Sequence, residues 1–459
     1  METIKIIDGV YCKASRGLWP YISPLIEYEG EHWRAGKYAK IKETKTRSFL
    51  DRRGGKFLIG FLPRVKTSLA ERGIAVSYVG ALRTRKPWFG PKLTNTEGTR
   101  PDQLLLQTGI ASRCAHAQRG VVLAPTGVGK TTVAMLITSM YYPKVRILFL
   151  CHTISLLTQT RDEFARQGFK GIHLIGGDYA KGLDPNAPIT MATVQTFSKI
   201  APEKYCDLFE VILVDEAHHT NSIESQFGQI LTNSIAPVKI GFTATLPGSR
   251  ETKLALEGII GPVVGNITIQ QGVDMQIMAK PSVKLLSVPY NALFGDIKKY
   301  AELYSKAIVE NRARNSLIAR EALLFKARGL STLIIVKEIM QGNNLVDILR
   351  VRGANCIFVE GKTPGETREQ VKKQLNQKTT PIVICTAVWK EGVNIPSLNC
   401  VINACGGKSE IATLQAIGRG LRAIPGKDTV MLVDFLDPYK YLAQHAIKRL
   451  SIYVEAGWL

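Results

Sequence analysis

The sequence has no stretch long and apolar enough to cross a membrane, because none of its apolar runs approaches about 18 residues. Its start, METIKIIDGVYCK, carries acidic residues and lacks a basic region followed by an apolar run, so we expect no secretory signal. The eight cysteines include no C-x-x-C pair, which argues against structural zinc and against a disulfide framework. Reduced thiols in a cytosolic type of compartment are the simplest interpretation.

Acidic residues are few relative to basic ones. The 459 residues include 60 Lys and Arg against 38 Asp and Glu, which gives a net charge of +22 and a pI of about 9.6. Residues 1–100 hold 20 of the basic and 9 of the acidic residues, so half of the excess lies in less than a quarter of the chain. A positive field of this size attracts polyanions. The charge therefore favours nucleic acid as a partner over a merely soluble basic protein.

The pattern of apolar segments divides the chain into three regions. Residues 1–95 contain short alternating pieces, which predicts a small basic α+β domain, and RKPWFGPK at 85–92 predicts a linker. From residue 96 on, short apolar runs alternate with helical stretches; the runs lie at 120–125, 146–152, 188–193, 211–216, 238–245, 331–336, 355–361, 381–386, 399–405 and 429–435. Strands of this kind form parallel sheets. We therefore predict an α/β fold with two doubly wound domains in tandem, at 96–275 and 276–459.

The segment APTGVGKTT, residues 124–132, has the composition of a loop that holds phosphates. It follows an apolar run and precedes a helical stretch, which is the strand–loop–helix context that such a loop requires. Gly127 and Gly129 let backbone N–H groups turn inward. Lys130 supplies charge to the β- and γ-phosphates, and Thr131 offers a hydroxyl to Mg²⁺. The remaining predicted cofactor contacts in the loop are Pro125, Thr126, Val128 and Thr132.

A pair of carboxylates ends the apolar run in VILVDEAHH, residues 211–219. We expect Asp215 to hold Mg²⁺, directly or through water, and Glu216 to orient or deprotonate the attacking water. Acidic pairs also occur as solvated strand ends, but four apolar residues leading into D-E-A-H, 85 residues after Lys130, disfavour that alternative. The two motifs together predict an Mg²⁺-dependent nucleoside triphosphate hydrolase.

Two further motifs indicate what the hydrolysis serves. GFTATLP at 241–247 contains Thr243-Ala244-Thr245, and QAIGRGLR at 415–422 carries Gln415, Gly418, Arg419 and Arg422. Together with the first two motifs they stand in the order of the superfamily 2 helicases, which the sequence resembles over residues 96–440. The resemblance implies two RecA-like domains and the use of ATP with Mg²⁺. Ala124, where the usual phosphate loop has glycine, is a form that these helicases commonly show.

The resemblance also implies roles for single residues. Gln103 would recognise adenine, and Gln415, Arg419 and Arg422 would take part in catalysis. The two arginines would reach the γ-phosphate from the second domain as fingers in cis. The implied contacts to the nucleic-acid backbone are Thr153, Gln159, Gly177, Thr193 and Thr386, and Gly392 is an implied nucleotide contact. Asn394 stands where the family often has aspartate, so no acidic role is implied there.

The N-terminal region bears on the choice of substrate. Three tryptophans lie among basic residues in its sequence, and RSFLDRRGGK at 47–56 offers a turn edged with positive charge. Basic and aromatic residues together suit contact with duplex or junction DNA. The predicted contacts are Arg52, Arg53, Lys56, Arg83 and Arg85. A core role for the tryptophans and a solvated basic face are the alternatives.

A small basic domain ahead of a two-domain motor resembles the phage recombination helicases of the UvsW kind and, more distantly, the RecG-like branch-migration enzymes. The resemblance implies an ATP-dependent DNA helicase that remodels branched or forked DNA. It also implies a monomer in a bacterial or phage-infected cytoplasm rather than a eukaryotic nucleus. Three alternatives stay open: an RNA helicase or non-unwinding duplex translocase, the motor subunit of a restriction-type nuclease, and a DNA-binding protein whose ATPase has decayed.

Overall fold

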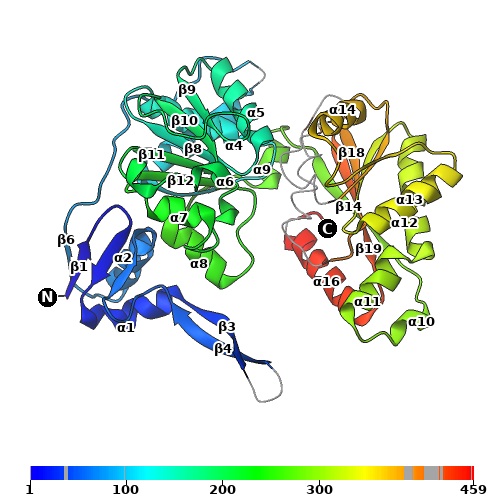
Figure 1. Cartoon of the computed structure of the whole chain (residues 1–459), viewed down its shortest axis with the longest axis horizontal. Helices are drawn as coiled ribbons and strands as arrows, with labels where there is room; N and C mark the ends of the chain where they lie inside the picture. Colours follow the sequence, from blue (N-terminus) through cyan, green and yellow to red (C-terminus); the bar gives the residue numbers. More distant parts are fainter. Residues whose placement is uncertain are drawn as a thin grey trace. The chain divides into compact units, whose positions relative to one another are not determined.

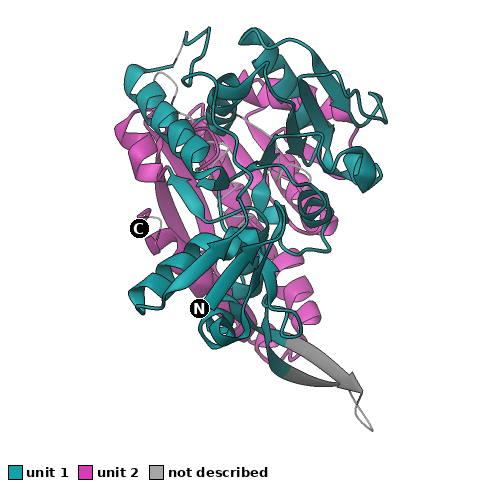
Figure 2. Cartoon of the chain, turned by 90° about the vertical axis from the view of Figure 1, so that its left-hand side faces the viewer, with its two compact units in different colours: residues 1–124, 129–266 teal, residues 125–128, 267–459 magenta. Residues whose placement is uncertain are grey.

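The computed structural model describes residues 2–35, 40–97, 99–386, 395, 397–407, 423, 427–455 and 457–459, without side chains at 31–35 and 40–43. The chain forms two compact units (Figures 1 and 2). They comprise residues 1–124 with 129–266, and residues 125–128 with 267–459. Among the described residues, no helix is both long and apolar enough to cross a bilayer.

A four-stranded sheet opens the first unit, with strand order β5-β2-β1-β6. Its strands are β1 (Glu2–Ile6), β2 (Tyr11–Ala14), β5 (Lys56–Leu58) and β6 (Val76–Val79). β6 pairs in parallel with β1 because α2 (Leu62–Glu71) carries the chain across after β5, whereas the other pairs are antiparallel. The short helices are η1 (Arg16–Leu18), α1 (Trp19–Ile22), η2 (Ser23–Ile26) and η3 (Ile59–Phe61). This is the predicted small α+β region.

β3 (Glu27–Ala35) and β4 (Lys40–Ser48) form a two-stranded antiparallel ribbon outside that sheet. Figure 1 shows the ribbon extending away from the sheet. Its base is fixed to α8 (Arg250–Ile259), where the Arg250 guanidinium donates a hydrogen bond of 2.6 Å to the carbonyl of Glu27. The sequence analysis did not predict this ribbon.

The rest of the first unit is built on a seven-stranded, wholly parallel sheet with strand order β13-β7-β12-β11-β8-β10-β9. Its strands are β7 (Arg119–Leu123), β8 (Ile147–Cys151), β9 (Ile172–Ile175), β10 (Ile189–Thr193), β11 (Val211–Asp215), β12 (Val238–Thr243) and β13 (Val263–Asn266). Its other helices are α3 (Pro101–Ala117), α4 (Lys130–Tyr141), α5 (Ile154–Arg166), α6 (Val194–Phe197), η4 (Pro202–Lys204), η5 (Ala217–His219) and α7 (Gln226–Thr232). β8, β10 and β12 are buried along their whole length, which explains their unbroken apolar runs.

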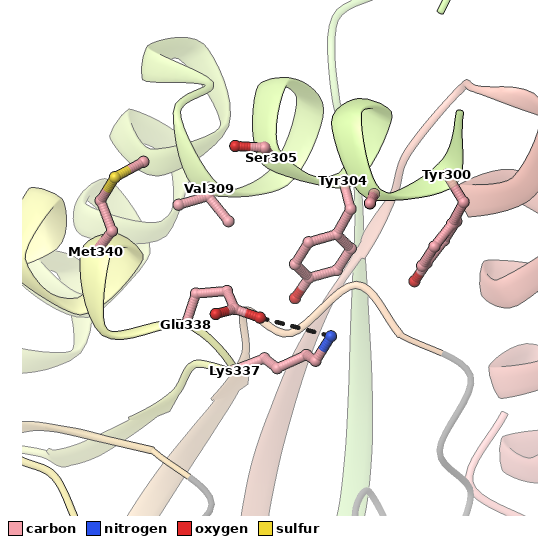
Figure 3. Close-up of a pocket in the computed structure, with 8 residues that line it drawn as sticks. Tyr300, Tyr304, Ser305, Val309, Lys337, Glu338 and Met340 are labelled. Atoms are coloured by element: carbon pink, nitrogen blue, oxygen red, sulfur yellow. Dashed lines mark ion pairs between the residues drawn. The ribbon is translucent and has the colours of Figure 1, made fainter. Parts of the chain in front are cut away.

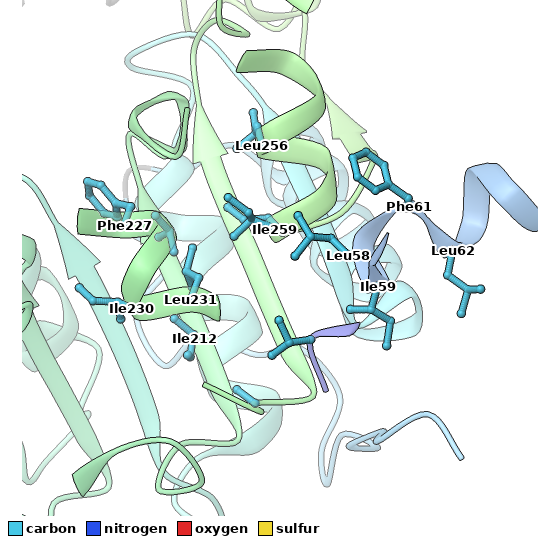
Figure 4. Close-up of a cluster of buried hydrophobic side chains, with 14 of the residues drawn as sticks. Leu58, Ile59, Phe61, Leu62, Ile212, Phe227, Ile230, Leu231, Leu256 and Ile259 are labelled. Atoms are coloured by element: carbon cyan, nitrogen blue, oxygen red, sulfur yellow. The ribbon is translucent and has the colours of Figure 1, made fainter. Parts of the chain in front are cut away.

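The N-terminal sheet and the seven-stranded sheet share one hydrophobic core. Figure 4 shows Leu58, Ile59 and Phe61 from the N-terminal region beside Leu256 and Ile259 of α8. All five side chains are at most 3% exposed. The N-terminal region is therefore packed against the first parallel-sheet domain rather than tethered to it.

Two close backbone contacts reinforce this shared core. Gly60 lies so near α8 that a Cβ there would be 2.1 Å from the carbonyl oxygen of Glu257. The buried Arg119 guanidinium donates hydrogen bonds to the carbonyls of Gly9 (2.9 Å) and Ile259 (3.0 Å). Removing residues 1–95 would expose apolar surface of the parallel-sheet domain, so point substitutions are the better test of what the N-terminal region does.

The segment 85–92 has no helix or strand, as its prolines and glycine predict, but it is fixed along the first unit. The Trp88 N–H donates to the carbonyl of Met140 at 2.8 Å, and the Lys92 N–H donates to the hydroxyl of Ser139 at 3.0 Å. The predicted linker is thus held along the first unit by hydrogen bonds. We call the segment 85–92 the strap.

The second unit contains a six-stranded, wholly parallel sheet with strand order β14-β19-β18-β15-β17-β16. Its strands are β14 (Lys280–Ser287), β15 (Ser331–Ile335), β16 (Ile357–Val359), β17 (Ile382–Cys385), β18 (Leu398–Asn403) and β19 (Thr429–Leu436). Its helices are α9 (Ile269–Asp274), α10 (Ala292–Gly295), α11 (Tyr300–Tyr304), the π-helix η6 (Ser305–Val309), α12 (Arg312–Ala327), α13 (Ile339–Val351), α14 (Gly365–Asn376) and α16 (Lys440–Glu455).

The predicted fold class, two RecA-like parallel-sheet domains with a small N-terminal α+β region, is confirmed. The first parallel sheet ends at Asn266 and the second begins at Lys280. The domain bounds at residues 95 and 275 stay predictions.

Candidate nucleotide and nucleic-acid site

The loop 124–129 joins the end of β7 to the start of α4. Gly127 and Gly129 have φ angles of +96° and +91°, a conformation that other residues rarely adopt. Gly129 is the N-cap of α4 and has no side chain to satisfy the first amides of the helix, which lack partners within it. The start of α4 therefore presents N–H groups and the positive end of a helix dipole to an anion such as a phosphate.

Gln107 lies against this loop, which the sequence analysis did not predict. Its side chain is fully buried on α3, and a Cβ placed on Gly129 would lie 2.2 Å from its Nε2 atom. Gln107 is one helical turn after Gln103, the residue implied to recognise adenine, and this spacing of four is the signal that could have found it. Gln103 itself is half-buried on the same helix.

Lys130, Thr131 and Asp215 are the residues that would hold the phosphates and Mg²⁺. The Lys130 ammonium donates to the carbonyl of Ala124 at 3.3 Å, across the loop. Thr131 stands in the first turn of α4, and Asp215 is the last residue of β11. Mg²⁺ usually takes one or two protein oxygens and completes its shell with phosphate and water, so one hydroxyl and one carboxylate fit it. Within the described residues no cluster of three His, Cys, Asp or Glu offers an all-protein metal site.

Glu216 has a strained backbone and contacts a buried histidine. Its φ of 50° and ψ of 49° are left-handed, which is uncommon for a residue with a side chain. Its carboxylate lies 3.3 Å from Nδ1 of His218, and that nitrogen lies 3.0 Å from the Thr243 hydroxyl. The Thr243 hydroxyl in turn donates to the carbonyl of Thr245 at 2.8 Å. One histidine thus joins Glu216 to the Thr-Ala-Thr motif.

The pKa values of the Asp215 and Glu216 carboxyl groups are shifted in opposite directions. Burial raises the pKa of Asp215, and the negative charge of Glu216 raises it further. Burial also opposes ionisation of Glu216, but the charge of Lys130, the contact with His218 and the electrostatic effect of His219 outweigh it and lower the pKa of Glu216. Glu216 is therefore ionised at neutral pH, the state in which a carboxylate can accept a proton from water.

Three of the predicted nucleic-acid contacts gather at the carboxyl ends of β8, β9 and β10. Thr153 is the N-cap of α5. Gly177 has a φ of +55°, and a Cβ there would lie 2.7 Å from Ile154; a Cβ on Gly176 would lie 2.5 Å from the Thr193 hydroxyl. Thr193 is only 3% exposed, so a bound strand would meet the loop around it rather than its side chain.

A pair of stacked histidines connects η5, which follows β11, with the segment that follows β8. His219 stacks on His152 with ring centroids 4.7 Å apart and an interplanar angle of 15°. His152 directly precedes Thr153, and its Nδ1 lies 3.3 Å from Nε2 of Gln195. His152, His219 and Gln195 were not among the functional residues predicted from the sequence. The doubled histidine of DEAHH was the available signal, but its stacking partner is far away in the sequence.

The remaining predicted residues of the parallel-sheet domains differ in exposure. Gln159 lies on the exposed face of α5 and donates to the Glu163 carboxylate at 2.9 Å. Thr386, directly after β17, is 7% exposed, and its N–H donates to the carbonyl of Val359 at 3.1 Å. The residues Gly392, Gln415, Arg419 and Arg422 lie outside the described residues.

Buried ion pairs fix the chain just ahead of the segment with the predicted arginine fingers. Arg449 pairs with Asp434 at 2.8 Å and also donates to the carbonyl of Gly407 at 2.7 Å. Arg314 pairs with Asp437 at 2.8 Å. All four charged side chains are at most 2% exposed. Removing one partner would leave an uncompensated buried charge, which typically costs about 3–5 kcal/mol.

The basic turn after β4 is exposed, and two of its three predicted contacts already have partners. Arg53 is exposed. Arg52 is 68% exposed and forms an ion pair with Glu27 at 3.0 Å. The Lys56 ammonium lies 3.7 Å from the centre of the Tyr11 ring. Such exposed pairs are weak and can exchange for a phosphate.

On the strap 85–92, Arg85 has a structural partner. Its guanidinium pairs with Glu210 at 2.9 Å and lies 5.7 Å from the centre of the Trp88 ring. Trp88 is 56% exposed, so it is not a core residue. Arg83, just before the strap, is exposed.

The geometry around Gly129 generates a first prediction. Gly129→Ala should weaken nucleotide binding severely, because the new Cβ would meet Gln107 and would also sit at a positive φ. Adding Gln107→Ala removes the clash but not the unfavourable φ, so the double variant should recover affinity only in part. Titration with a fluorescent ATP analogue measures both. Full affinity in Gly129→Ala would show that the loop does not contact the nucleotide in this conformation.

Comparison with known families matches both parallel-sheet domains. The model of the type III restriction enzyme, res subunit, matches residues 97–248, and the helicase conserved C-terminal domain matches residues 315–424. The first match contains the phosphate loop and the D-E-A-H residues, and the second reaches the predicted arginine fingers.

Individual relatives agree with these matches. The chain is 25% identical over 366 residues to the ATP-dependent DNA helicase uvsW of Enterobacteria phage T4, covering 74% of this chain and 72% of that protein. It is 27% identical over 341 residues to the DNA 3'-5' translocase XPB2 of Sulfurisphaera tokodaii, covering 66% and 75%. The crystal structure of the Pyrococcus furiosus Hef helicase domain shares the fold, with a TM-score of 0.51 and 14% identity over 75% of this chain and 97% of that one.

The family matches, the ordered motifs and the two parallel sheets agree with one another. The chain belongs to the superfamily 2 helicases, a family of ATP-hydrolysing enzymes.

Proposed function

We propose that this chain is an ATP-dependent DNA helicase or translocase that remodels branched or forked DNA, acting as a monomer. The observation that carries the proposal is the shared edge of the seven-stranded sheet. The phosphate loop, the D-E-A-H residues and the Thr-Ala-Thr motif follow β7, β11 and β12, and the predicted strand contacts follow β8, β9 and β10. The net charge of +22 and the DNA-acting relatives support DNA as the track.

We assign the steps of hydrolysis to residues of this edge. The first amides of α4 and Lys130 would bind the triphosphate, and Thr131 and Asp215 would hold Mg²⁺. When bound, Mg²⁺ would supply positive charge against the negative charge that develops on the phosphates. Glu216, held ionised, would orient water and accept its proton. Gln415, Arg419 and Arg422 are the proposed catalytic contributors from the second domain.

The strand contacts in this proposal are made to the backbone of the nucleic acid. Hydroxyls and N–H groups near Thr153, Gly177 and Thr386, with the exposed Gln159, would bind phosphates without reading bases. Little sequence preference follows from such contacts.

The stacked histidines connect Glu216, in the proposed ATP site, with the proposed nucleic-acid contacts around Thr153. Glu216 contacts His218, its neighbour His219 stacks on His152, and His152 contacts Gln195. Glu216 directly follows β11, and Gln195 lies in α6, directly after β10. We infer that a strand bound beside Thr153 changes the position of Glu216 through the stack.

Loss of the general base is the first test of the function. Glu216→Gln should lower ATP turnover by about 10²–10⁴-fold while nucleotide binding persists, because the amide cannot accept a proton. Glu224→Gln, in an exposed loop a few residues away, is the matched control and should behave as wild type. Steady-state phosphate release with and without DNA checks both variants.

Unwinding assays on the wild-type protein distinguish DNA from RNA as the substrate. Unwinding of matched forked DNA, four-way DNA junctions and RNA duplexes should show activity on the DNA substrates with ATP and Mg²⁺. Unwinding of RNA alone would contradict the proposal, and so would ATP turnover that is indifferent to every nucleic acid. Light scattering of the active species checks the monomer.

The histidine stack has its own prediction. His152→Ala should leave basal ATP turnover near wild type but reduce its stimulation by DNA at least about fivefold, the lower range of ordinary coupling between sites. His152→Phe keeps an aromatic ring on His219 and should retain part of the stimulation. If basal and stimulated turnover fell by the same factor in His152→Ala, the residue would support the fold rather than the coupling.

The exposed basic turn is proposed to contact duplex or junction DNA. Arg53→Glu reverses the charge of one exposed side chain, so the fold should be unaffected. Affinity for a four-way junction, measured by fluorescence anisotropy, should fall, and it should fall more at low salt. Unchanged junction affinity at low salt would remove this turn from the DNA interface.

A restriction-type nuclease motor is the weaker candidate. The family model that matches residues 97–248 takes its name from such an enzyme, but the match covers the ATP-binding domain. Within the described residues, no group of three or more His, Cys, Asp or Glu side chains is placed to hold a metal ion.

A further inference from the structure

A cavity of about 330 Å³ lies in the second unit, at the end of β15 (Figure 3). Lys337 and Glu338 follow that strand by two and three residues, and α11 with the π-helix η6 covers the other side. Ligands of parallel α/β sheets bind outside the carboxyl ends of the strands, which is where this cavity lies. Its volume is near the lower end for a small-molecule site.

An aromatic ring with a fixed orientation forms one wall of the cavity. Tyr304 is 5% exposed, and its hydroxyl donates to the carbonyl of Cys405 at 2.6 Å, next to the end of β18. Tyr300 lies beside it, with ring centroids 5.9 Å apart and a tilt of 43°. Tyr300 is 38% exposed and Met340, on another wall, is 47% exposed. The cavity thus has one exposed aromatic ring, that of Tyr300, on which a planar ring could stack.

A cation stands at the rim of this surface. The Lys337 ammonium lies 4.7 Å from the centre of the Tyr304 ring and 3.5 Å from the carboxylate of Glu338. The side chains of Lys337 and Glu338 are 55% and 48% exposed, so their ion pair is weak and Lys337 can turn to a phosphate. The Glu338 carboxylate can then accept a hydrogen bond from an amino group of a base.

The backbone over the cavity is irregular at the same place. Ser305–Val309 is a π-helix, and Ser305 and Val309 line the cavity. π-helical turns are rare and occur often at functional sites. An irregular helix, exposed aromatic and thioether side chains, and a rim cation coincide in one cavity.

We propose that this cavity holds one nucleotide of the strand on which the motor acts, with the base against Tyr300 and the phosphate at Lys337. The inference rests on the proposed function. One cation with a carboxylate beside it does not suit a triphosphate or another multiply charged small molecule. Base–aromatic stacking with a single phosphate contact is the usual pattern of single-strand binding. The site adds a base-stacking contact to the backbone contacts of the first domain.

Four variants of the full chain, two of them controls, test the site. Tyr300→Ala should weaken binding of a short single-stranded oligonucleotide about tenfold, the loss expected for one stacked base. Lys337→Ala should weaken binding less and reduce the salt dependence by about one phosphate contact. Ile339→Ala is the control, because Ile339 is 48% exposed between two lining residues but does not line the cavity. Tyr300→Phe keeps the ring and should bind like wild type, which separates stacking from a folding defect.

An oligonucleotide carrying the fluorescent base 2-aminopurine reports stacking directly. Its fluorescence should be quenched on wild type and on Tyr300→Phe, and should recover on Tyr300→Ala. If wild type binds the strand and Tyr300→Ala binds it equally well, the cavity does not hold a nucleotide, a protein side chain becomes the better occupant, and the motor function stands. If wild type binds no DNA or RNA strand at all, the proposed function and this site fail together.

Discussion

Hydrogen bonding between parallel strands is the constraint on which this molecule depends. Parallel pairing places every strand of the seven-stranded sheet in the same direction, so all of their carboxyl ends meet at one edge. The proposed phosphate loop, the carboxylates of Asp215 and Glu216 and the proposed strand-contact loops are distant in sequence but share that edge. The second unit repeats the constraint, and the cavity at Tyr300 and Lys337 lies at the corresponding edge of its sheet.

Polar contacts, rather than apolar packing, give this edge its specificity. Glu216 keeps a left-handed backbone next to His218, and the same histidine contacts Thr243. Polar groups in a buried network are costly to leave unpaired, so displacement of one member is felt by the next. The stacked rings of His219 and His152 extend the network to the adjacent strand. A motor needs such a connection, because hydrolysis at one site must respond to a strand at another.

Much of this structure could be predicted from local patterns, and the rest depended on contacts between distant residues. Unbroken apolar runs predicted the buried parallel strands, and Gly127 and Gly129 predicted a loop whose N–H groups turn inward. The contact of Gln107 with Gly129 and the stack of His152 on His219 join residues that are distant in the sequence, so local patterns do not predict these contacts. The sequence predicted the N-terminal region as a separate domain. It did not predict the core around Phe61, because that core also joins residues that are distant in the sequence.

The central claim is that nucleotide and nucleic acid bind to one connected edge and affect each other. Thermodynamic linkage makes this coupling reciprocal, so it can be measured from the strand side without any hydrolysis. The most direct measurement is the affinity of the wild-type protein for a labelled DNA strand, with and without a non-hydrolysable ATP analogue and Mg²⁺. We expect the two affinities to differ by at least about fivefold. Equal affinities in both states, with the analogue shown to be bound, would contradict the account.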